Sequence, residues 1–239
     1  MTHRIRAAAL VLAVILLAPL PALRAGSAEG PLSHFSIRIL TKDWFDLGLG
    51  YKYESAWPRL QQARAAALAT VGERDVESYD WARQTLTLTP TASERLRAAL
   101  AEAMPSRPAD PSRAGDALPG ELYLKGFVVE VDDQAIYGGI FLQAISQMAI
   151  DYPVIRAEQG AARRVVLHIA PLQAWATFAD PTASTEHGVG QVRHALGSAW
   201  ADSLKDPKFK ALVDGFWTKV EDPRIRGVFA RAGTLRDTP

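Results

Sequence analysis

The sequence contains no cysteine among its 239 residues. Disulfide bonds, thiolate catalysis, cysteine-ligated zinc and iron–sulfur clusters are therefore excluded. The lipid anchor of a bacterial lipoprotein also requires a cysteine, so attachment to a membrane by that route is excluded as well. The fold has to be held together by an apolar core, and 48% hydrophobic residues supply enough material for one.

Several motifs that bind nucleotides or position a nucleophile are missing too. The chain has no glycine-rich dinucleotide fingerprint, no P-loop and no G-x-S-x-G turn. His187 and His194 are separated by about two helical turns, whereas a zinc-binding helix places its histidines one turn apart with a glutamate between them. We therefore expect no cofactor and no metal site, and no motif in the sequence indicates a catalytic residue.

An excess of charge of either sign is also missing. The chain carries 27 Lys and Arg residues against 26 Asp and Glu residues. Without residues 1–28, which hold three arginines and no acid, the balance becomes 24 basic against 26 acidic residues. Such a chain has no field that attracts nucleic acid or an anionic membrane surface, so we expect no nucleic-acid partner.

Long apolar runs are absent except near the N-terminus. Two arginines precede the unbroken apolar run 7–18, which ends before Pro19 and is followed by small residues at positions 25–28. This order is typical of a secretory signal peptide cleaved after Ala25 or Ala28. The alternative is a retained membrane anchor, but the run is shorter than the roughly 20 residues that cross a bilayer. We expect a periplasmic or secreted protein with no stable membrane span after cleavage.

The remaining residues, 29–239, predict a single α+β domain with a mostly antiparallel sheet packed by two or three helices. Alternating apolar residues predict strands, and apolar residues at helical spacing predict helices. Residues 105–120 carry four prolines and predict a mobile loop, and residues 186–231 predict a helical C-terminal extension. The expected strands are 34–40, 84–89, 122–131, 136–142, 153–157 and 164–170, and the expected helices are 56–71 and 91–104.

Local signals add detail to some of these elements. Thr91 and Glu94 have the spacing of a capping box at the start of the second helix. Gly72 is placed to end the first helix. The sequence Asp-Pro occurs at 206–207 and again at 222–223, and each pair predicts a helix with aspartate as the N-cap and proline at the first helical position.

The stretch VEVDDQAIYGG, residues 129–139, predicts a β-hairpin with a four-residue loop from Asp132 to Ala135. Two adjacent glycines inside a strand indicate a bulge, or the close approach of another backbone or of a ligand. Tyr137, Gly138 and Gly139 are therefore candidate binding residues.

A second candidate site is the aromatic segment DWFDLGLGYKYESAW, residues 43–57. Trp44, Tyr51, Tyr53 and Trp57 are the candidate binding residues there, because aromatic side chains among polar neighbours often bind sugars or proteins. The alternative is that these rings pack at the edge of the core, as large aromatic side chains usually do.

These observations favour a non-enzymatic exported protein of the bacterial envelope that binds a partner protein or an envelope polymer such as a polysaccharide. The alternative is a periplasmic hydrolase whose site is assembled from distant His, Asp and Glu residues, His187 and His194 among them. A weaker alternative is an assembly factor that keeps its N-terminal helix as a membrane tether. His168 lies within a predicted strand, where we expect a hydrogen-bonded neutral side chain.

Overall fold

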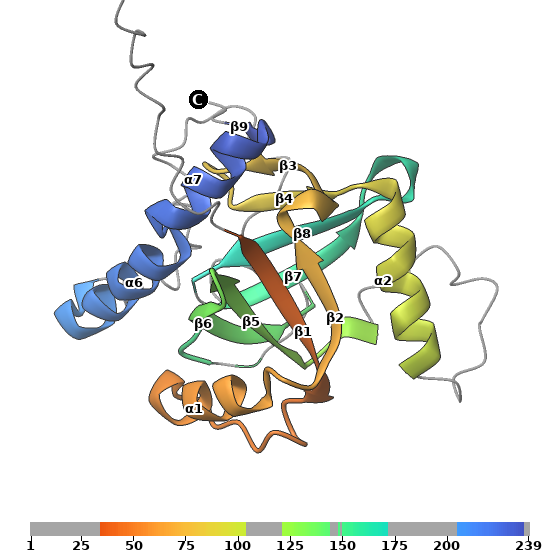
Figure 1. The fold of residues 1–239 in the computed structure, drawn as a ribbon. Coiled ribbons are helices and arrows are strands. Elements are labelled where there is room, and N and C mark those ends of the chain that lie inside the picture. Colours follow the sequence, from red (N-terminus) through yellow and green to blue (C-terminus); the bar gives the residue numbers. More distant parts are fainter. Residues whose placement is uncertain (1–33, 104–120, 144–147, 149, 172–204, 237–239) are drawn as a thin grey trace, which may run out of the picture. The chain divides into compact units, whose positions relative to one another are not determined.

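A nine-stranded sheet organises the computed structural model of the protein (Figure 1). The structure describes residues 34–103, 121–143, 148, 150–171 and 205–236. The elements in chain order are β1 (Phe35–Asp43), α1 (Tyr53–Ala63), β2 (Ala67–Gly72), the short helix η1 (Glu73–Asp75), β3 (Val76–Asp80), β4 (Thr85–Leu88), α2 (Pro90–Ala103), β5 (Lys125–Val131), β6 (Gln134–Phe141), β7 (Val154–Gln159), the short helix η3 (Ala161–Arg163), β8 (Val165–Ala170), α6 (Pro207–Val220), α7 (Pro223–Ala232) and β9 (Leu235–Arg236).

The connection between β2 and β3 requires the sheet to curl. The strand order is β2-β1-β5-β6-β7-β8-β4-β3-β9, so β2 and β3 are seven places apart. In a flat sheet that separation would be about 34 Å. Only the three residues of η1 join the two strands, and such a link reaches at most about 14 Å. The strands therefore wrap around an interior, as Figure 1 shows.

Most neighbouring strands run antiparallel, and the parallel pairs are β6 with β7 and β3 with β9. The β6–β7 pairing covers only the registers Ile140 with Val154 and Phe141 with Ile155. The α+β class and the mostly antiparallel sheet that the sequence predicts are thus confirmed.

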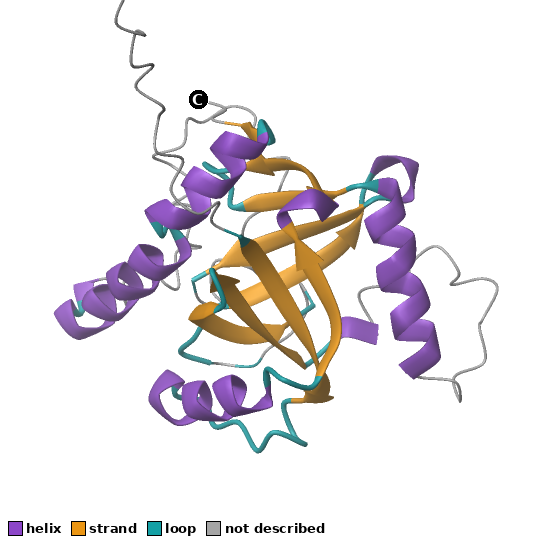
Figure 2. Ribbon diagram, in the orientation of Figure 1, coloured by secondary structure: helices purple, strands orange, loops and turns teal. Residues whose placement is uncertain are grey.

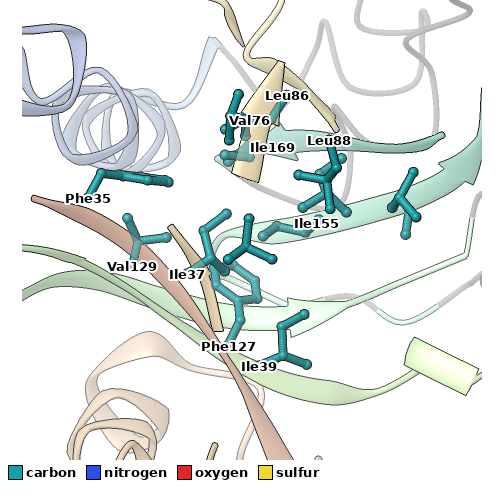
Figure 3. Close-up of a cluster of buried hydrophobic side chains, with 14 of the residues drawn as sticks. Phe35, Ile37, Ile39, Val76, Leu86, Leu88, Phe127, Val129, Ile155 and Ile169 are labelled. Carbon is teal, nitrogen blue, oxygen red and sulfur yellow. The ribbon is translucent and has the colours of Figure 1, made fainter. Parts of the chain in front are cut away.

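The inner face of the curled sheet holds the larger apolar core (Figure 3). Alternate residues of most strands point inward, as strand geometry requires. α2 and α7 add their own apolar residues to this core. The inward residues that Figure 3 labels are Phe35, Ile37, Ile39, Val76, Leu86, Leu88, Phe127, Val129, Ile155 and Ile169.

A second apolar core lies on the opposite, outer face of β5 and β6. It is formed where α1 and α6 pack on that face, and Figure 2 shows both helices beside the strands. Leu60 of α1, Val128 of β5 and Ile140 of β6 are fully buried there, together with Phe216 of α6 at 3% exposure.

The first predicted helix is only partly confirmed. α1 ends at Ala63, and residues 67–72 form β2 instead of continuing the helix. The alanine-rich segment has a high helix propensity, but β2 gains a ladder of hydrogen bonds with β1, in which Val71 lies opposite Ile37. Tertiary pairing therefore outweighs local propensity here.

The sequence also failed to predict β3 and β9. Val76 and Tyr79 of β3 both point into the inner core although they are three residues apart, because the register shifts between Val76 and Ser78. That irregularity breaks the alternation by which a strand is recognised. β9 has only two residues and gives no periodic signal.

The capping box predicted for α2 is wrong, although the helix itself is confirmed. Pro90 occupies the first turn, and the side-chain oxygen of Thr89 accepts a hydrogen bond from the backbone N–H of Ala92 at 3.2 Å. Thr89 is therefore the N-cap, and Glu94 forms an ion pair with Arg97. Proline at the first helical position explains this two-residue difference, because its missing N–H costs nothing there.

The hairpin between β5 and β6 is confirmed, but its loop is shorter than predicted. Val131 lies opposite Gln134, so only Asp132 and Asp133 form the turn. Both have positive φ angles, 53° and 59°, which is the conformation of a type I′ turn. Asp132 also accepts a hydrogen bond from the backbone N–H of His34 at 2.7 Å, which ties the turn to β1.

The two Asp-Pro signals are confirmed in full. Asp206 caps α6 and Asp222 caps α7, each through a hydrogen bond from the backbone N–H two residues later, and proline follows each cap. The predicted signal peptide, the loop 105–120 and the first part of the C-terminal extension, residues 186–204, lie outside the described residues.

Candidate functional site

The loop between β1 and α1 forms a hydrogen-bonded platform. One carboxylate oxygen of Asp43 accepts from the backbone N–H groups of Phe45 and Asp46, both at 3.0 Å. The backbone closes on itself through the N–H of Leu47 to the carbonyl of Asp43, also at 3.0 Å. Leu47 and Leu49 are buried in the outer core, so the loop is anchored from below.

This loop carries three neighbouring aromatic side chains, Trp44, Phe45 and Tyr51. We call them the aromatic surface. Phe45 is 69% exposed and Tyr51 is 56% exposed, and they are the exposed large apolar side chains within the described ranges. Both rings lie against Trp44, with centroid distances of 5.0 and 5.5 Å. The indole N–H of Trp44 donates to the hydroxyl of Tyr152 at 2.8 Å, which fixes the central ring.

A charged pair lies at the border of the aromatic surface. The ammonium group of Lys52 bonds to the carboxylate of Asp151, and this hydrogen bond raises the pKa of Lys52 above its ordinary value. The backbone N–H of Asp151 donates to the carbonyl of Tyr51 at 2.9 Å. The segment before β7 therefore holds the aromatic loop from the side. Tyr152 itself is buried, and burial raises the pKa of its hydroxyl.

Tyr53 and Trp57 belong to the outer core instead. Their rings stack at 5.6 Å with an interplanar angle of 15°, and Phe216 meets Tyr53 edge-on at 5.0 Å. The ammonium group of Lys219 lies 5.5 Å from the centre of the Tyr53 ring. These contacts join α1 to α6. Burial raises the pKa of Tyr53, so its hydroxyl stays protonated at neutral pH.

The two glycines of β6 allow other parts of the chain to approach closely. A side chain at Gly138 would lie 2.6 Å from the carbonyl of Phe127 and 3.1 Å from the ring of Trp57. A side chain at Gly139 would lie 1.7 Å from the carbonyl oxygen of Pro153. The close approach expected at these glycines is therefore made by the backbone and by α1. Tyr137 points into the inner core and is fully buried.

The structure thus separates the candidate binding residues into groups. Tyr53, Trp57 and Gly138 meet where α1 packs on β6, whereas Trp44 and Tyr51 meet on the loop before α1. Phe45 was not among the candidates, although it is the most exposed of these rings. Its position between Trp44 and Asp46 gave a signal, because an aspartate-rich turn with glycines often presents a side chain at the surface.

A group of three polar side chains lies on the outer face of β4, β8 and β7, and the sequence did not predict it. The hydroxyl oxygen of Thr85 lies 3.1 Å from Nδ1 of His168, and Nε2 of His168 lies 2.8 Å from a carboxylate oxygen of Glu158. The N–H direction at Nε2 is inclined away from that oxygen, so the contact has the length but not the linearity of a good hydrogen bond. We call these three residues the polar relay.

The carboxylate of Glu158 lies close to both His168 and Arg156. The close contact with His168 is the main cause that lowers the pKa of Glu158, and burial opposes it. The positive charge of Arg156 also lowers this pKa, as does that of His168 when the imidazole is protonated. Nη2 of Arg156 lies 3.7 Å from the other carboxylate oxygen of Glu158. His168 is hydrogen bonded, as expected from its strand, while His187 and His194 lie outside the described residues.

Within the described ranges, no group of three His, Asp or Glu residues has a geometry that could hold a metal ion. None of the helices in that part of the chain is both long and apolar enough to cross a bilayer. Comparisons with models of known protein families, with curated protein sequences and with solved structures give no match. The function therefore has to be argued from the residues themselves.

Proposed function

We propose that this chain is an exported protein of the bacterial envelope that binds a partner protein or an envelope polymer through its aromatic surface. The observation that carries the proposal is the exposure of Phe45 and Tyr51 on a loop that is fixed on several sides. An exposed Leu or Val would need no explanation, but neighbouring exposed aromatic rings are typical of binding surfaces.

The fixed loop also explains why binding would be efficient. Association has to overcome the entropy lost when side chains and loops become ordered, about 0.5–1.5 kcal/mol for each immobilised side chain. The hydrogen bonds to Asp43 and the Trp44–Tyr152 contact have already ordered this loop. More of the interaction energy between the rings and the partner is then retained as affinity.

Export rests on the signal-peptide pattern in residues 1–28 and is compatible with a chain that has no cysteine. The intact mass of the protein isolated from the periplasm tests it. The expected mass is that of a chain beginning after Ala25 or Ala28, and a mass that includes Met1 would contradict cleavage.

Substitution of the most exposed ring tests binding. We expect Phe45→Ala to weaken partner binding by about 30-fold, the equivalent of a 2 kcal/mol hot spot, while the stability of the fold changes little. Phe45→Tyr keeps the ring and should keep most of the affinity. Pull-down from envelope extracts and co-sedimentation with insoluble envelope polysaccharide would measure the effect and distinguish the two partner classes. Equal capture by wild-type protein and by Phe45→Ala combined with Tyr51→Ala would refute the proposal.

A further inference from the structure

The polar relay is built from three neighbouring strands with matching register. Thr85 of β4 lies directly opposite His168 of β8, and Val166, two residues before His168, lies opposite Glu158 of β7. Glu158 is therefore a diagonal neighbour of His168, within reach of a long side chain. All three side chains point to the outer face, since the residues between them, such as Leu167 and Ala157, point into the inner core.

The hydroxyl of Thr85 has two hydrogen-bond acceptors within reach. It lies 3.1 Å from the carbonyl oxygen of Arg83 and 3.1 Å from Nδ1 of His168. If the imidazole is neutral with its proton on Nε2, Nδ1 has a free lone pair and accepts the Thr85 proton, while the protonated Nε2 lies 2.8 Å from the carboxylate of Glu158. If the imidazole is doubly protonated, Nδ1–H donates to Thr85, and the hydroxyl must turn to Arg83.

The first arrangement places a hydroxyl, a base and an orienting carboxylate in the order that an acyl-transfer site requires. Arg156 lies opposite His168 in the register, and its Nη2 lies 3.7 Å from the other carboxylate oxygen of Glu158. The inclined contact between His168 and Glu158 is not an obstacle, since catalytic hydrogen bonds often become aligned only when substrate is bound.

We propose that Thr85, His168 and Glu158 form a second site, which hydrolyses carboxylic esters through an acyl-threonine intermediate. Oγ1 of Thr85 attacks the ester carbonyl carbon and gives its proton to Nδ1 of His168. The bond to the alcohol breaks, and that proton passes to the departing alkoxide. Water, deprotonated by the same nitrogen, then attacks the acyl group, releases the carboxylic acid and restores the Thr85 hydroxyl. Glu158 is a positioning residue that fixes the proton of His168 on Nε2.

The position of Thr85 is set by the residue before it. Gln84 has a φ angle of 50° and is buried at 1% exposure. Its side chain bonds to the hydroxyl of Tyr79 and to the carbonyl of Trp81, and its own carbonyl accepts from the backbone N–H of Ile169 at 2.9 Å. The strained backbone and the bond to the residue after His168 together hold Thr85 in register with His168.

Hydrolysis of p-nitrophenyl acetate by the whole protein tests the site. We expect wild-type protein to release nitrophenolate catalytically and acid-quenched protein to carry an acetyl group on Thr85. Thr85→Val should abolish release, and His168→Gln should slow it by about 10²- to 10⁴-fold. Thr85→Ser should retain activity, and Thr87→Val, which changes the next outward threonine of β4, should behave as wild type. Equal rates for wild type and Thr85→Val, or acetyl groups on lysines alone, would overturn the proposal.

The protonation of His168 gives a second test that needs no substrate. Nitrogen NMR of wild-type protein at about pH 8 should show a proton on Nε2 and none on Nδ1. Glu158→Gln should change this tautomer balance, which a merely structural substitution on the sheet surface would not do. A proton on Nδ1 in the wild type would overturn the assigned base. These tests do not involve Phe45 or Tyr51, so they succeed or fail independently of the proposed binding function.

Discussion

The outer face of the sheet is divided into two regions of opposite character. Over β5 and β6 most outward side chains are apolar and lie under α1 and α6, as Val128 and Ile140 do. The exception is Glu130 of β5, which is buried in ion pairs with Arg38 and Arg64. We call this region the covered half. Over β4, β8 and the later part of β7 the outward side chains are mostly polar or charged, among them Thr85, His168 and Glu158. We call this region the polar half.

The inward residues of both regions are equally apolar and belong to one core. The two halves therefore differ only in their outward residues, because an antiparallel sheet needs only one buried face. In the covered half the outward residues pack against helices, whereas in the polar half they are available for chemistry. The aromatic surface lies beside the covered half, where α1 and its preceding loop supply the rigid support that a binding site needs.

The largest effect on stability should come from truncating a buried side chain in the covered half. We expect Leu60→Ala to lower the free energy of unfolding by about 2–5 kcal/mol, because Leu60 is fully buried between α1 and the sheet and truncation leaves a cavity. Urea denaturation followed by circular dichroism measures the change. Val166→Ala, an aliphatic truncation at a half-buried position of the polar half, should cost less than about 1 kcal/mol. Equal costs at the two positions would refute the division into two halves.

A smaller effect is expected where α1 approaches the backbone of β6. Gly138→Ala should destabilise the fold by about 1–3 kcal/mol, because the added methyl group would be 2.6 Å from the carbonyl of Phe127. Thermal unfolding of the purified variant measures this cost. The matched control is Gly215→Ala in α6, where an added methyl group meets no atom within 4 Å and should stabilise the helix by about 0.5–1 kcal/mol. A neutral Gly138→Ala would show that the carbonyl of Phe127 in β5 and the ring of Trp57 in α1 lie further from Gly138.

The fold was predictable wherever one strong local signal agreed with the tertiary structure. The α+β class, α2 and the caps Asp206 and Asp222 follow from periodicity and from the chemistry of helix ends. β2 was not predictable, because its alanine-rich sequence favours a helix and only its pairing with β1 makes it a strand. The curl of the sheet was equally hidden, since it depends on a short link between strands that are distant in the sheet order.

The candidate site was predictable only in part. The aromatic segment indicated a surface, but composition alone could not divide its rings into the exposed Tyr51 and the buried Tyr53, which depends on where α1 begins and what α6 covers. The polar relay gave no sequence signal at all. Thr85 and His168 are 83 residues apart in the chain, and only the register of β4 and β8 brings them together.

The smallest expected effect concerns the polar half and its response to acid. The close contact with His168 lowers the pKa of Glu158 in the folded protein, so folding favours the ionised carboxylate. This contribution is complete above the unfolded carboxyl pKa of about 4.3 and is lost as the pH falls through the lower folded value. Since the side chain is 40% exposed, solvent screening should keep it below about 1 kcal/mol.

Glu158→Gln removes the titrating group, so the difference in unfolding free energy between wild type and variant should shrink between about pH 6 and about pH 3. Urea titrations at both pH values measure that difference. Glu102→Gln, at an exposed position in the last turn of α2, should show no comparable loss. A difference for Glu158→Gln that stays constant across this range would mean that Glu158 gains nothing from its neighbours. The polar half would then be an ordinary solvated surface, and its contrast with the covered half would lie in packing alone.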